Sequence, residues 1–347
     1  MRAASYQAFG GPIDIGRLPD PGPAPDSVVL RVAASGVCRS DYHGWQGYDP
    51  DITLPHVPGH ELAGVIEELG ADVTGWARGQ RVTVPFVTAC GRCPRCRSGN
   101  QQICDHQEQP GFTHWGSFAE LVEIRHAAGN LVALPETVDF VAAASLGCRF
   151  TTAWRAVVSQ GRTRPGEWLA VHGAGGVGLS AVMVGRALGA RVVAVDIQPA
   201  ALELARSLGA ESSVDALQDG RVAEAVREIT GGGAHVSLDA LGSAATCANS
   251  ICCLRKGGRH VQVGLMVGAE REHPVPMDLV ISRELELVGS HGMPAHGFAR
   301  LLDMMVAGAL DPARLVRRRV NLERGVAALT EMAEHCQPGI TVIEMDT

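Results

Sequence analysis

One stretch of six residues near the middle of the chain restricts its fold more than any other feature. The stretch consists of Gly173, Ala174, Gly175, Gly176, Val177 and Gly178. It follows an apolar run at 168–172 and precedes apolar residues at helical spacing, after which a second apolar run ends in Asp196. A strand, a glycine-rich turn, a helix and a second strand form the unit that holds a dinucleotide pyrophosphate at the helix N-terminus. The sequence therefore predicts a Rossmann domain with a doubly wound parallel sheet.

Asp196 also indicates which dinucleotide is bound. It lies eighteen residues after Gly178, where a carboxylate hydrogen-bonds the ribose 2′-hydroxyl of NAD and would repel the 2′-phosphate of NADP. The sequence thus favours NAD(H). Further apolar runs at 235–239, 259–264 and 285–289 supply enough strands for a six-stranded sheet.

Length, charge and cysteine content exclude several other classes of protein. A chain of 347 residues suits two domains of about 100–200 residues each. The net charge of -7 arises from 37 acidic and 30 basic residues without long runs, which disfavours a nucleic-acid partner or an anionic membrane. Because no apolar run reaches about 18 residues, no membrane span is predicted, and a cytoplasmic protein is expected. Ten cysteines in such a chain are more readily metal ligands, core residues or catalytic groups than disulfides.

The chain before the glycine motif has the texture of an antiparallel, barrel-like domain. Short β-like segments are separated by Pro and Gly clusters, and residues 27–33 alternate between apolar and polar. His60 and Glu61 stand where a Pro- and Gly-containing loop meets the apolar run 62–66, a junction that would hold ligands rigidly. A helix is expected over 298–307 and a strand over 340–345, and this tail is expected to rejoin the first domain.

Four cysteines give the most specific spacing in the chain. Cys90, Cys93, Cys96 and Cys104 form a C-x2-C-x2-C-x7-C array within fifteen residues. Four thiolates at this density close a tetrahedral zinc site, and with no position left open its role would be structural. Two alternatives remain open at this stage, namely reduced cysteines without a metal and an iron–sulfur cluster.

The order and spacing of these motifs resemble the medium-chain, zinc-dependent alcohol dehydrogenases over nearly the whole chain. Three further motifs carry the resemblance: Cys38-Arg-Ser-Asp-Tyr-His43, Gly59-His60-Glu61 and Gly147-Cys148. The resemblance implies a GroES-like β-barrel catalytic domain that is interrupted by a Rossmann NAD-binding domain, with the active site in the cleft between them. The implied ranges are 1–152 and 291–347 for the catalytic domain, 90–104 for its structural zinc lobe, and 153–290 for the NAD-binding domain.

The resemblance also implies two zinc ions per chain. Cys38, His60 and Cys148 would bind the catalytic zinc, since two thiolates and one imidazole leave a fourth tetrahedral position open. Taken alone, Cys148 would be an ordinary core cysteine. Glu61 would be a carboxylate near the zinc that exchanges into its coordination shell. Asp41 would orient His60, because a ligating histidine commonly donates its other N–H to a carboxylate.

Further positions match the family's proton relay and cofactor contacts. Ser40 and His43 would pass a proton from the alcohol to solvent, for which an imidazole with a pKa of about 6.5 is suited. Arg39 would contact the pyrophosphate and Thr152 the nicotinamide, in addition to the glycines and Asp196. Val263 and Ser290 would lie at the carboxamide end.

Two residues depart from the family pattern. Thr341 stands where many members carry an arginine that reaches the cofactor phosphates, so that Arg39 would matter more here. Arg149 follows Cys148 where a small residue is common; it would favour an anionic substrate, stabilise the thiolate, or point away from the site. The short interval from Cys104 to Gly116 resembles the tetrameric microbial enzymes, so a homotetramer is expected, with a dimer as the alternative.

The expected activity is NAD(H)-dependent interconversion of a small-molecule alcohol with its aldehyde or ketone. Trp45, Phe86, Trp115 and Met293 resemble pocket positions that suit an apolar, medium-sized alcohol, although each fits a plain core position equally well. A polyol or secondary-alcohol dehydrogenase of the sorbitol or threonine type is the nearest alternative, but that branch usually has Glu in place of Cys148. A non-catalytic protein that binds NAD and zinc is the more remote alternative.

Overall fold

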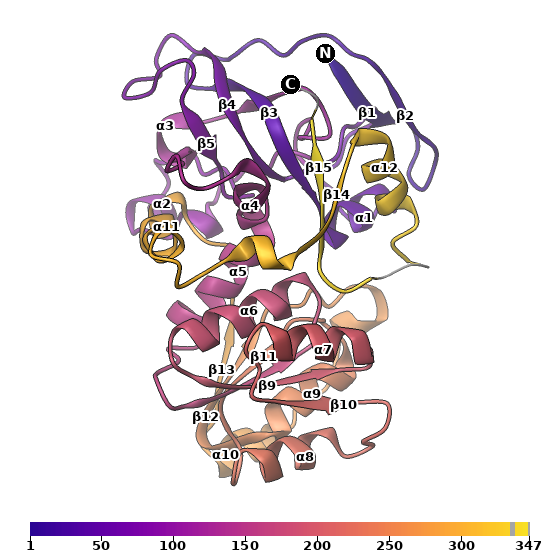
Figure 1. Ribbon diagram of the computed structural model, residues 1–347, viewed down its shortest axis with the longest axis vertical. Coiled ribbons are helices and arrows are strands. Elements are labelled where there is room, and N and C mark those ends of the chain that lie inside the picture. Colours follow the sequence, from indigo (N-terminus) through magenta and orange to yellow (C-terminus); the bar gives the residue numbers. More distant parts are fainter. Residues whose placement is uncertain (334–336, 346–347) are drawn as a thin grey trace. The chain divides into compact units, whose positions relative to one another are not determined.

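The computed structural model describes residues 1–333 and 337–345, which form two compact units. The first unit contains Met1–Thr151 and the segment that starts at Gly292; the second contains Thr152–His291 and Gln337–Gly339. The first is built on a mixed sheet and the second on a parallel sheet (Figure 1). The predicted fold class is therefore confirmed. Within the described residues no helix is both long and apolar enough to cross a membrane.

The second unit has a six-stranded parallel sheet in the order β10-β9-β8-β11-β12-β13. Its strands are β8 (Trp168–His172), β9 (Arg191–Asp196), β10 (Ser212–Asp215), β11 (Ala234–Asp239), β12 (Leu254–Gln262) and β13 (Glu286–Gly289). All five residues of β8 are buried, as is typical of a parallel strand that is covered on both faces. Figure 1 shows α6 and α7 on one side of the sheet and α8 and α9 on the other.

The helices of this unit connect the strands in the pattern that the sequence predicted. They are α6 (Gly176–Ala187), α7 (Pro199–Ser207), α8 (Val222–Ile229), α9 (Ala244–Cys252) and α10 (Met277–Ser282). The tight turn between β8 and α6 depends on two glycines. Gly173 has φ +91°, a conformation that L side chains rarely adopt, and a Cβ on Gly178 would lie 1.7 Å from the Gly173 carbonyl oxygen.

The first unit contains a seven-stranded sheet and a separate hairpin of β1 (Arg2–Tyr6) and β2 (Ile13–Arg17). The sheet runs in the order β14-β15-β3-β4-β5-β7, and β6 also pairs with β3. Its strands are β3 (Val28–Val37), β4 (Glu61–Leu69), β5 (Arg81–Thr83), β6 (Leu121–Ile124), β7 (Val132–Ala133), β14 (Val316–Val320) and β15 (Ile340–Glu344). Because β15 pairs antiparallel with β3, the C-terminal segment rejoins the sheet built by the start of the chain, as predicted.

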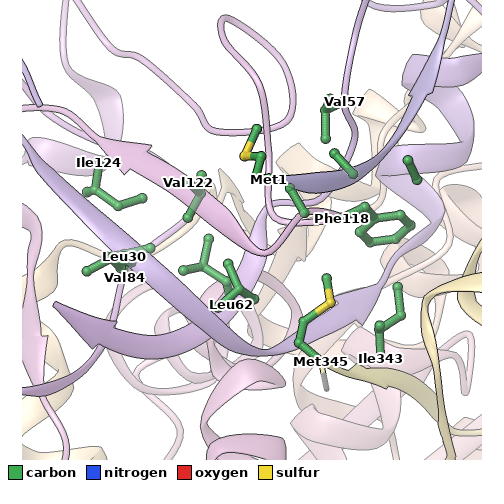
Figure 2. Packing of buried hydrophobic residues seen from close by; sticks show 14 of the residues in the cluster. Met1, Leu30, Val57, Leu62, Val84, Phe118, Val122, Ile124, Ile343 and Met345 are labelled. Atoms are coloured by element: carbon green, nitrogen blue, oxygen red, sulfur yellow. The ribbon is translucent and has the colours of Figure 1, made fainter. Parts of the chain in front are cut away.

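Short helices surround this sheet. They are α1 (Arg39–Trp45), α2 (Pro94–Arg97), α3 (Ala127–Asn130), α4 (Phe140–Ala144), α11 (Phe298–Val306) and α12 (Leu322–Thr330), with α5 (Thr151–Trp154) at the change between units. Two π-helices, Leu146–Phe150 and Arg155–Gln160, flank α5. Leu30, Leu62, Phe118, Ile124 and Ile343 belong to the buried core of the first unit, and Figure 2 shows them packed between its strands.

Candidate metal centres and dinucleotide site

Three predicted ligands from distant parts of the sequence meet in the first unit. Cys38 precedes α1 at the end of β3, His60 precedes β4, and Cys148 lies in the π-helix Leu146–Phe150. Their ligand atoms all lie within 4.8 Å of one another. Two thiols and one imidazole at this separation provide three of the four ligands of a tetrahedral zinc.

Asp41 holds two of these ligands in position. Its Oδ1 contacts His60 Nδ1 at 2.8 Å and accepts from the Gly59 N–H at 3.1 Å, while Oδ2 accepts from the Cys38 N–H at 3.0 Å. The Asp41 and His60 side chains are both fully buried. Because the carboxylate engages Nδ1, the other ring nitrogen, Nε2, is left to act as the ligand atom.

The orphaned nitrogen of His60 is the observation that best fits a metal. Nε2 is buried and has no hydrogen-bond partner among the described residues, which is costly for a polar atom unless a ligand engages it. The imidazole is held between two aromatic rings, with centroid distances of 5.3 Å to Phe112 and 6.3 Å to Phe86. The residues therefore fit a zinc ion.

The charges around the ligands favour metal binding at Cys38. The adjacent Cys148 thiol, His60 and Arg149 together hold the pKa of Cys38 well below its usual range, although burial opposes this. Burial alone would lower the pKa of His60, but the Asp41 carboxylate raises it well above the usual value. Because a metal ion binds the neutral imidazole, metal binding and protonation compete at His60 Nε2.

Glu61 and Arg149 lie next to the ligands and bind each other. Arg149 donates from its backbone N and from Nε to Glu61 Oε1, both at 2.9 Å, and its Nη2 contacts Oε2. Glu61 is not a member of the three-ligand group. The guanidinium charge is thus matched by a buried carboxylate.

The four-cysteine array also converges in space. The sulfur–sulfur distances are 3.4 Å for Cys93–Cys96, 3.5 Å for Cys104–Cys90, 3.8 Å for Cys93–Cys104 and 4.0 Å for Cys90–Cys96. A tetrahedral zinc with Zn–S bonds of about 2.3 Å places its sulfurs about 3.8 Å apart. The observed distances bracket that value, and they leave room for one ion rather than for a multi-iron cluster.

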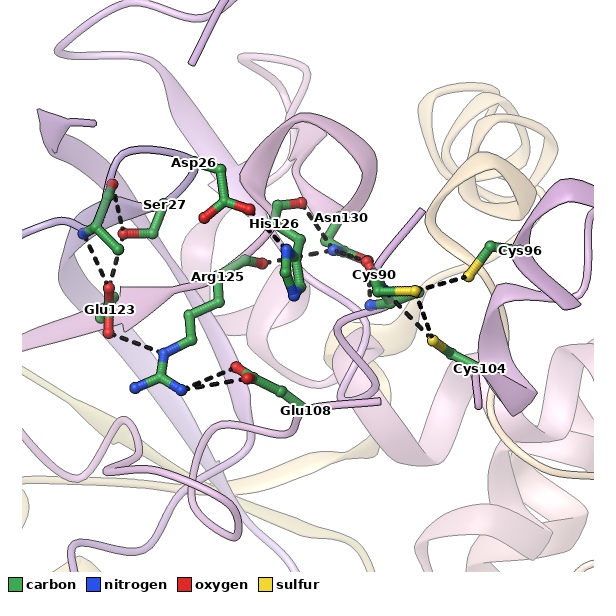
Figure 3. A network of polar contacts seen from close by, with 12 residues as sticks. Asp26, Ser27, Cys90, Cys96, Cys104, Glu108, Glu123, Arg125, His126 and Asn130 are labelled. Carbon is green, nitrogen blue, oxygen red and sulfur yellow. Dashed lines mark hydrogen bonds and ion pairs between the residues drawn. The ribbon is translucent and has the colours of Figure 1, made fainter. Parts of the chain in front are cut away.

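Backbone amides and Asn130 support this array (Figure 3). The N–H groups of Cys90 and His106 donate to Cys104 Sγ at 3.4 and 3.3 Å. Asn130 accepts from the Ala89 N–H at 2.9 Å and donates to the Ala89 carbonyl at 3.0 Å, which fixes the residue before Cys90. Although burial raises the pKa of Cys90, neighbouring backbone N–H groups lower it to about 7, so a thiolate forms readily there.

The glycine-rich turn and Asp196 form the candidate dinucleotide site of the second unit. Asp196 accepts from the Ala174 N–H at 2.6 Å and from the Gln198 N–H at 2.9 Å, so the carboxylate is fixed beside the turn. A Cβ on Gly175 would meet no protein atom within 4 Å, which leaves its surface open to a ligand. The hydroxyls of Thr152 and Ser290 are buried and have no hydrogen-bond partner in the described part of the chain, as expected of groups that contact a cofactor.

The other predicted positions have the following surroundings. Arg39, Ser40 and His43 share helix α1, with Arg39 exposed and the other two partly buried. Burial and the nearby Arg39 lower the pKa of His43. The Val263 N–H donates to the Asp239 carbonyl at 3.0 Å at the end of β12.

Two of the four suggested pocket residues have structural partners. Trp45 donates from Nε1 to the Gly11 carbonyl at 2.8 Å, and Trp115 donates to the Pro55 carbonyl at 3.1 Å. Met293 is buried. Phe86 contacts the His60 ring. Phe112 contacts the same ring, but the sequence did not point to it. The signal for Phe112 was weak, since it stands in a loop where Gly111 has φ +79° and no periodicity applies.

Fold and site together define a zinc-binding, dinucleotide-dependent dehydrogenase, and comparisons with known proteins agree. Residues 24–136 match the family described as alcohol dehydrogenase GroES-like domain, and residues 176–307 match zinc-binding dehydrogenase. An alcohol dehydrogenase of Geobacillus stearothermophilus is 36% identical over 84% of each chain. An NAD-dependent alcohol dehydrogenase of Sulfurisphaera tokodaii is 32% identical over 96% of each chain. The solved structure of an alcohol dehydrogenase from Thermus sp. ATN1 superposes with a TM-score of 0.91 at 30% identity and covers 100% of both chains.

The chain belongs to the medium-chain, zinc-dependent alcohol dehydrogenase family. The resemblance that the sequence motifs carried is thus confirmed.

Proposed function

We propose that this protein is an NAD(H)-dependent zinc alcohol dehydrogenase that interconverts an alcohol with its aldehyde or ketone. The observation that carries the proposal is the convergence of Cys38, His60 and Cys148, with His60 Nε2 buried and without a hydrogen-bond partner among residues 1–333 and 337–345. A structural zinc site would close its fourth position with protein, whereas three protein ligands leave one position for a substrate oxygen. The cofactors are zinc and NAD(H).

We assign the catalytic zinc to these three ligands. The structural zinc belongs to Cys90, Cys93, Cys96 and Cys104. When bound, zinc supplies Lewis acidity toward the substrate oxygen, and NAD(H) accepts or supplies the hydride. Asp41 orients His60 by holding Nδ1, so that Nε2 faces the other ligands.

The proton chemistry is assigned to helix α1. The Ser40 hydroxyl would accept the proton of the alcohol while giving up its own proton toward His43, whose imidazole would release a proton to solvent. Burial and the nearby Arg39 lower the pKa of His43, which favours the neutral imidazole, the form that can accept a proton. Arg39, exposed on the same helix, is assigned to the cofactor pyrophosphate.

The cofactor side is assigned to the second unit. The backbone of the glycine motif approaches the pyrophosphate, and Asp196 binds the adenosine ribose, which selects NAD over NADP. Thr152, Val263 and Ser290 contact the nicotinamide end. The buried hydroxyls of Thr152 and Ser290, which have no hydrogen-bond partner in the part of the chain that the structure describes, support this assignment.

An apolar alcohol suits the surroundings of the proposed catalytic zinc. Phe86 and Phe112 flank the His60 ring, and the Arg149 charge is already paired with Glu61. A polyol substrate is disfavoured because the third ligand is the thiol of Cys148 rather than a carboxylate.

Zinc content and turnover, measured on the same samples, test the proposal. The wild type and Cys148→Ala are compared for zinc bound per chain and for NAD-linked oxidation of primary, secondary, benzylic and polyhydroxy alcohols. We expect Cys148→Ala to lose one zinc per chain together with turnover. Unchanged zinc in the variant would remove Cys148 from the site, and a zinc-replete wild type that oxidises none of the panel would contradict the proposed activity.

The same proposal covers assembly, compartment and domains. A homotetramer, or at least a dimer, is supported by Leu287 on the edge strand β13 and by Met277 and Ile281 on α10, all of which are exposed.

A cytoplasmic location is supported by the nine cysteines in the described residues, all of which are free. The domain limits 1–152 with 291–347, and 153–290, are supported by the division into compact units near Thr152 and Gly292. Light scattering of the purified protein measures the assembly.

A further inference from the structure

The ion pair between Glu61 and Arg149 is enclosed in the first unit. The side-chain exposures are 0% for Glu61 and 8% for Arg149. Three donors of a single residue, the backbone N, Nε and Nη2 of Arg149, engage the two carboxylate oxygens. This is the two-pronged geometry in which arginine binds a carboxylate most strongly, and a lysine ammonium cannot reproduce it.

The ion pair is connected to all three ligand segments. Glu61 directly follows His60, and Arg149 directly follows Cys148. The remaining nitrogen of the fork, Nη1, donates to the carbonyl of Val37 at 3.0 Å, and Val37 directly precedes Cys38. One guanidinium therefore links the three segments that deliver the ligands.

The sheet is built to accept this pair. Gly36 on β3 lies opposite Glu61 on β4 in the antiparallel register. A Cβ on Gly36 would lie 2.2 Å from Glu61 Oε2 and 2.8 Å from Arg149 Nη2. A side chain of any size at position 36 would collide with the pair, so the glycine is what lets the two charges pack against the strand.

Stability alone does not explain such a pair. The desolvation of two buried charges offsets most of their attraction, and well-packed apolar side chains are often as stable in the same place. A carboxylate beside a three-ligand metal group also creates a specific problem, because a free Glu61 would compete for the open coordination position. The contacts of Arg149 address that problem directly.

We infer that Arg149 is a positioning residue that braces the three ligand segments and holds Glu61 out of the metal's coordination shell, which keeps the fourth position open for substrate. The inference rests on the proposed function in requiring a metal at Cys38, His60 and Cys148. It does not depend on which alcohol is turned over.

Cobalt spectroscopy tests the inference because the d–d absorption bands of Co²⁺ report the ligands of the ion. Co²⁺ is introduced into the three-ligand site with zinc retained by the four cysteines, and both metals are counted per chain. The variants are Arg149→Met, Glu61→Gln and the double variant with both changes. Arg78→Met is the matched control, because Arg78 also pairs with a glutamate of the first unit but is exposed.

We expect the bands of Glu61→Gln and Arg78→Met to match the wild type, since Glu61 is not a ligand when Arg149 is present. Arg149→Met is expected to shift the bands, as the freed carboxylate of Glu61 binds the metal. The double variant is expected to restore the wild-type bands. A merely structural role for Arg149 would leave the double variant as perturbed as Arg149→Met.

A wild-type spectrum for Arg149→Met would overturn the inference, and so would a shift that persists in the double variant. Glu61→Gln alone keeps the test decisive if Arg149→Met does not fold, because a shift there would mean that Glu61 is a ligand despite Arg149. If the protein gives the expected spectra but oxidises no alcohol, the inference about Arg149 stands and the proposed function is refuted. If the protein oxidises alcohols but Arg149→Met leaves the bands unshifted, the proposed function stands and the inference about Arg149 is refuted.

Discussion

Replacement of Asp41 by asparagine should loosen the proposed catalytic zinc without removing a ligand. The carboxylate accepts from three buried donors, namely Cys38 N at 3.0 Å, Gly59 N at 3.1 Å and His60 Nδ1 at 2.8 Å. An asparagine has the same shape but only one acceptor oxygen. If that oxygen takes the place of Oδ1, the amide NH₂ faces the Cys38 N–H, and two donors then point at each other.

The size of the effect follows from these contacts. Loss of charge assistance costs about 1 kcal/mol for each of the two remaining bonds, and the unpaired Cys38 N–H adds about 1–3 kcal/mol. The upper limit is therefore about 3–5 kcal/mol, shared between folding and metal binding. Residues that orient a ligating histidine typically contribute 10–100-fold in metal affinity, or about 1.4–2.8 kcal/mol. We expect Asp41→Asn to weaken zinc binding by roughly this factor.

Competition with a chromophoric chelator measures the zinc affinity of the three-ligand site. Asp51→Asn serves as the control, because Asp51 lies in the segment after α1 but is exposed. Its zinc affinity should equal that of the wild type. The reasoning would be refuted if Asp41→Asn bound zinc within about twofold of the wild type, because the three hydrogen bonds would then have no part in holding the ligand.

Three further predictions use other parts of the structure. Gly175→Ala should leave the fold intact and weaken NAD binding by roughly tenfold, about 1.4 kcal/mol. Gly178→Ala should also destabilise the second unit by about 1–3 kcal/mol, because its Cβ would meet the Gly173 carbonyl. Calorimetric titration with NAD measures the first effect, and thermal unfolding measures the second. Cys104→Ser should cost one zinc per chain and expose residues 90–104 to hydrogen exchange, with the exchange of residues 38–60 unchanged; equal exchange in both segments would contradict separate sites. Burial lowers the pKa of His172 to about 3, below the unfolded value of about 6.5. Between these two pH values the unfolded state binds more protons than the folded state, so the free energy of unfolding falls as the pH falls. Denaturant unfolding at pH 6.5 and 5 should show the wild type losing about 1.6 kcal/mol more than His172→Asn, and equal losses would argue against a neutral buried imidazole.

Local patterns made the fold, the glycine motif and the four-cysteine array predictable, whereas the grouping of Cys38, His60 and Cys148 came from the family resemblance. The glycine motif and the four-cysteine array are short, and their function is tied to the backbone turns that they encode, so no long-range information was needed. The parallel sheet followed from alternating strand and helix signals, and β15 joined β3 as expected. Asp41 was assigned through the family resemblance, and metal-site chemistry supplied an independent reason, since a ligating histidine commonly donates its other N–H to a carboxylate.

Other features depend on register and on irregular helix geometry, which sequence patterns do not carry. The direction of Arg149 was left open because it stands in a π-helix, where the usual spacing of 3.6 residues per turn does not give the facing of a side chain. Gly36 carries meaning only once β3 is known to place it opposite Glu61. A glycine in a strand signals a close approach by some group, but the sequence does not say which group.

The two metal groups are held by different kinds of contact, and this difference bears on their roles. The four cysteines occupy residues 90–104, and apart from the Asn130 clamp on Ala89 their contacts are with each other and with nearby backbone N–H groups. The three-ligand group is instead cross-linked by Asp41 on one side and by the Glu61–Arg149 pair on the other, and the bond from Arg149 to Val37 joins segments 112 residues apart in sequence. A site whose ligands are fixed by the protein can leave one coordination position to a substrate without losing its geometry, which is what catalysis at a three-ligand zinc requires.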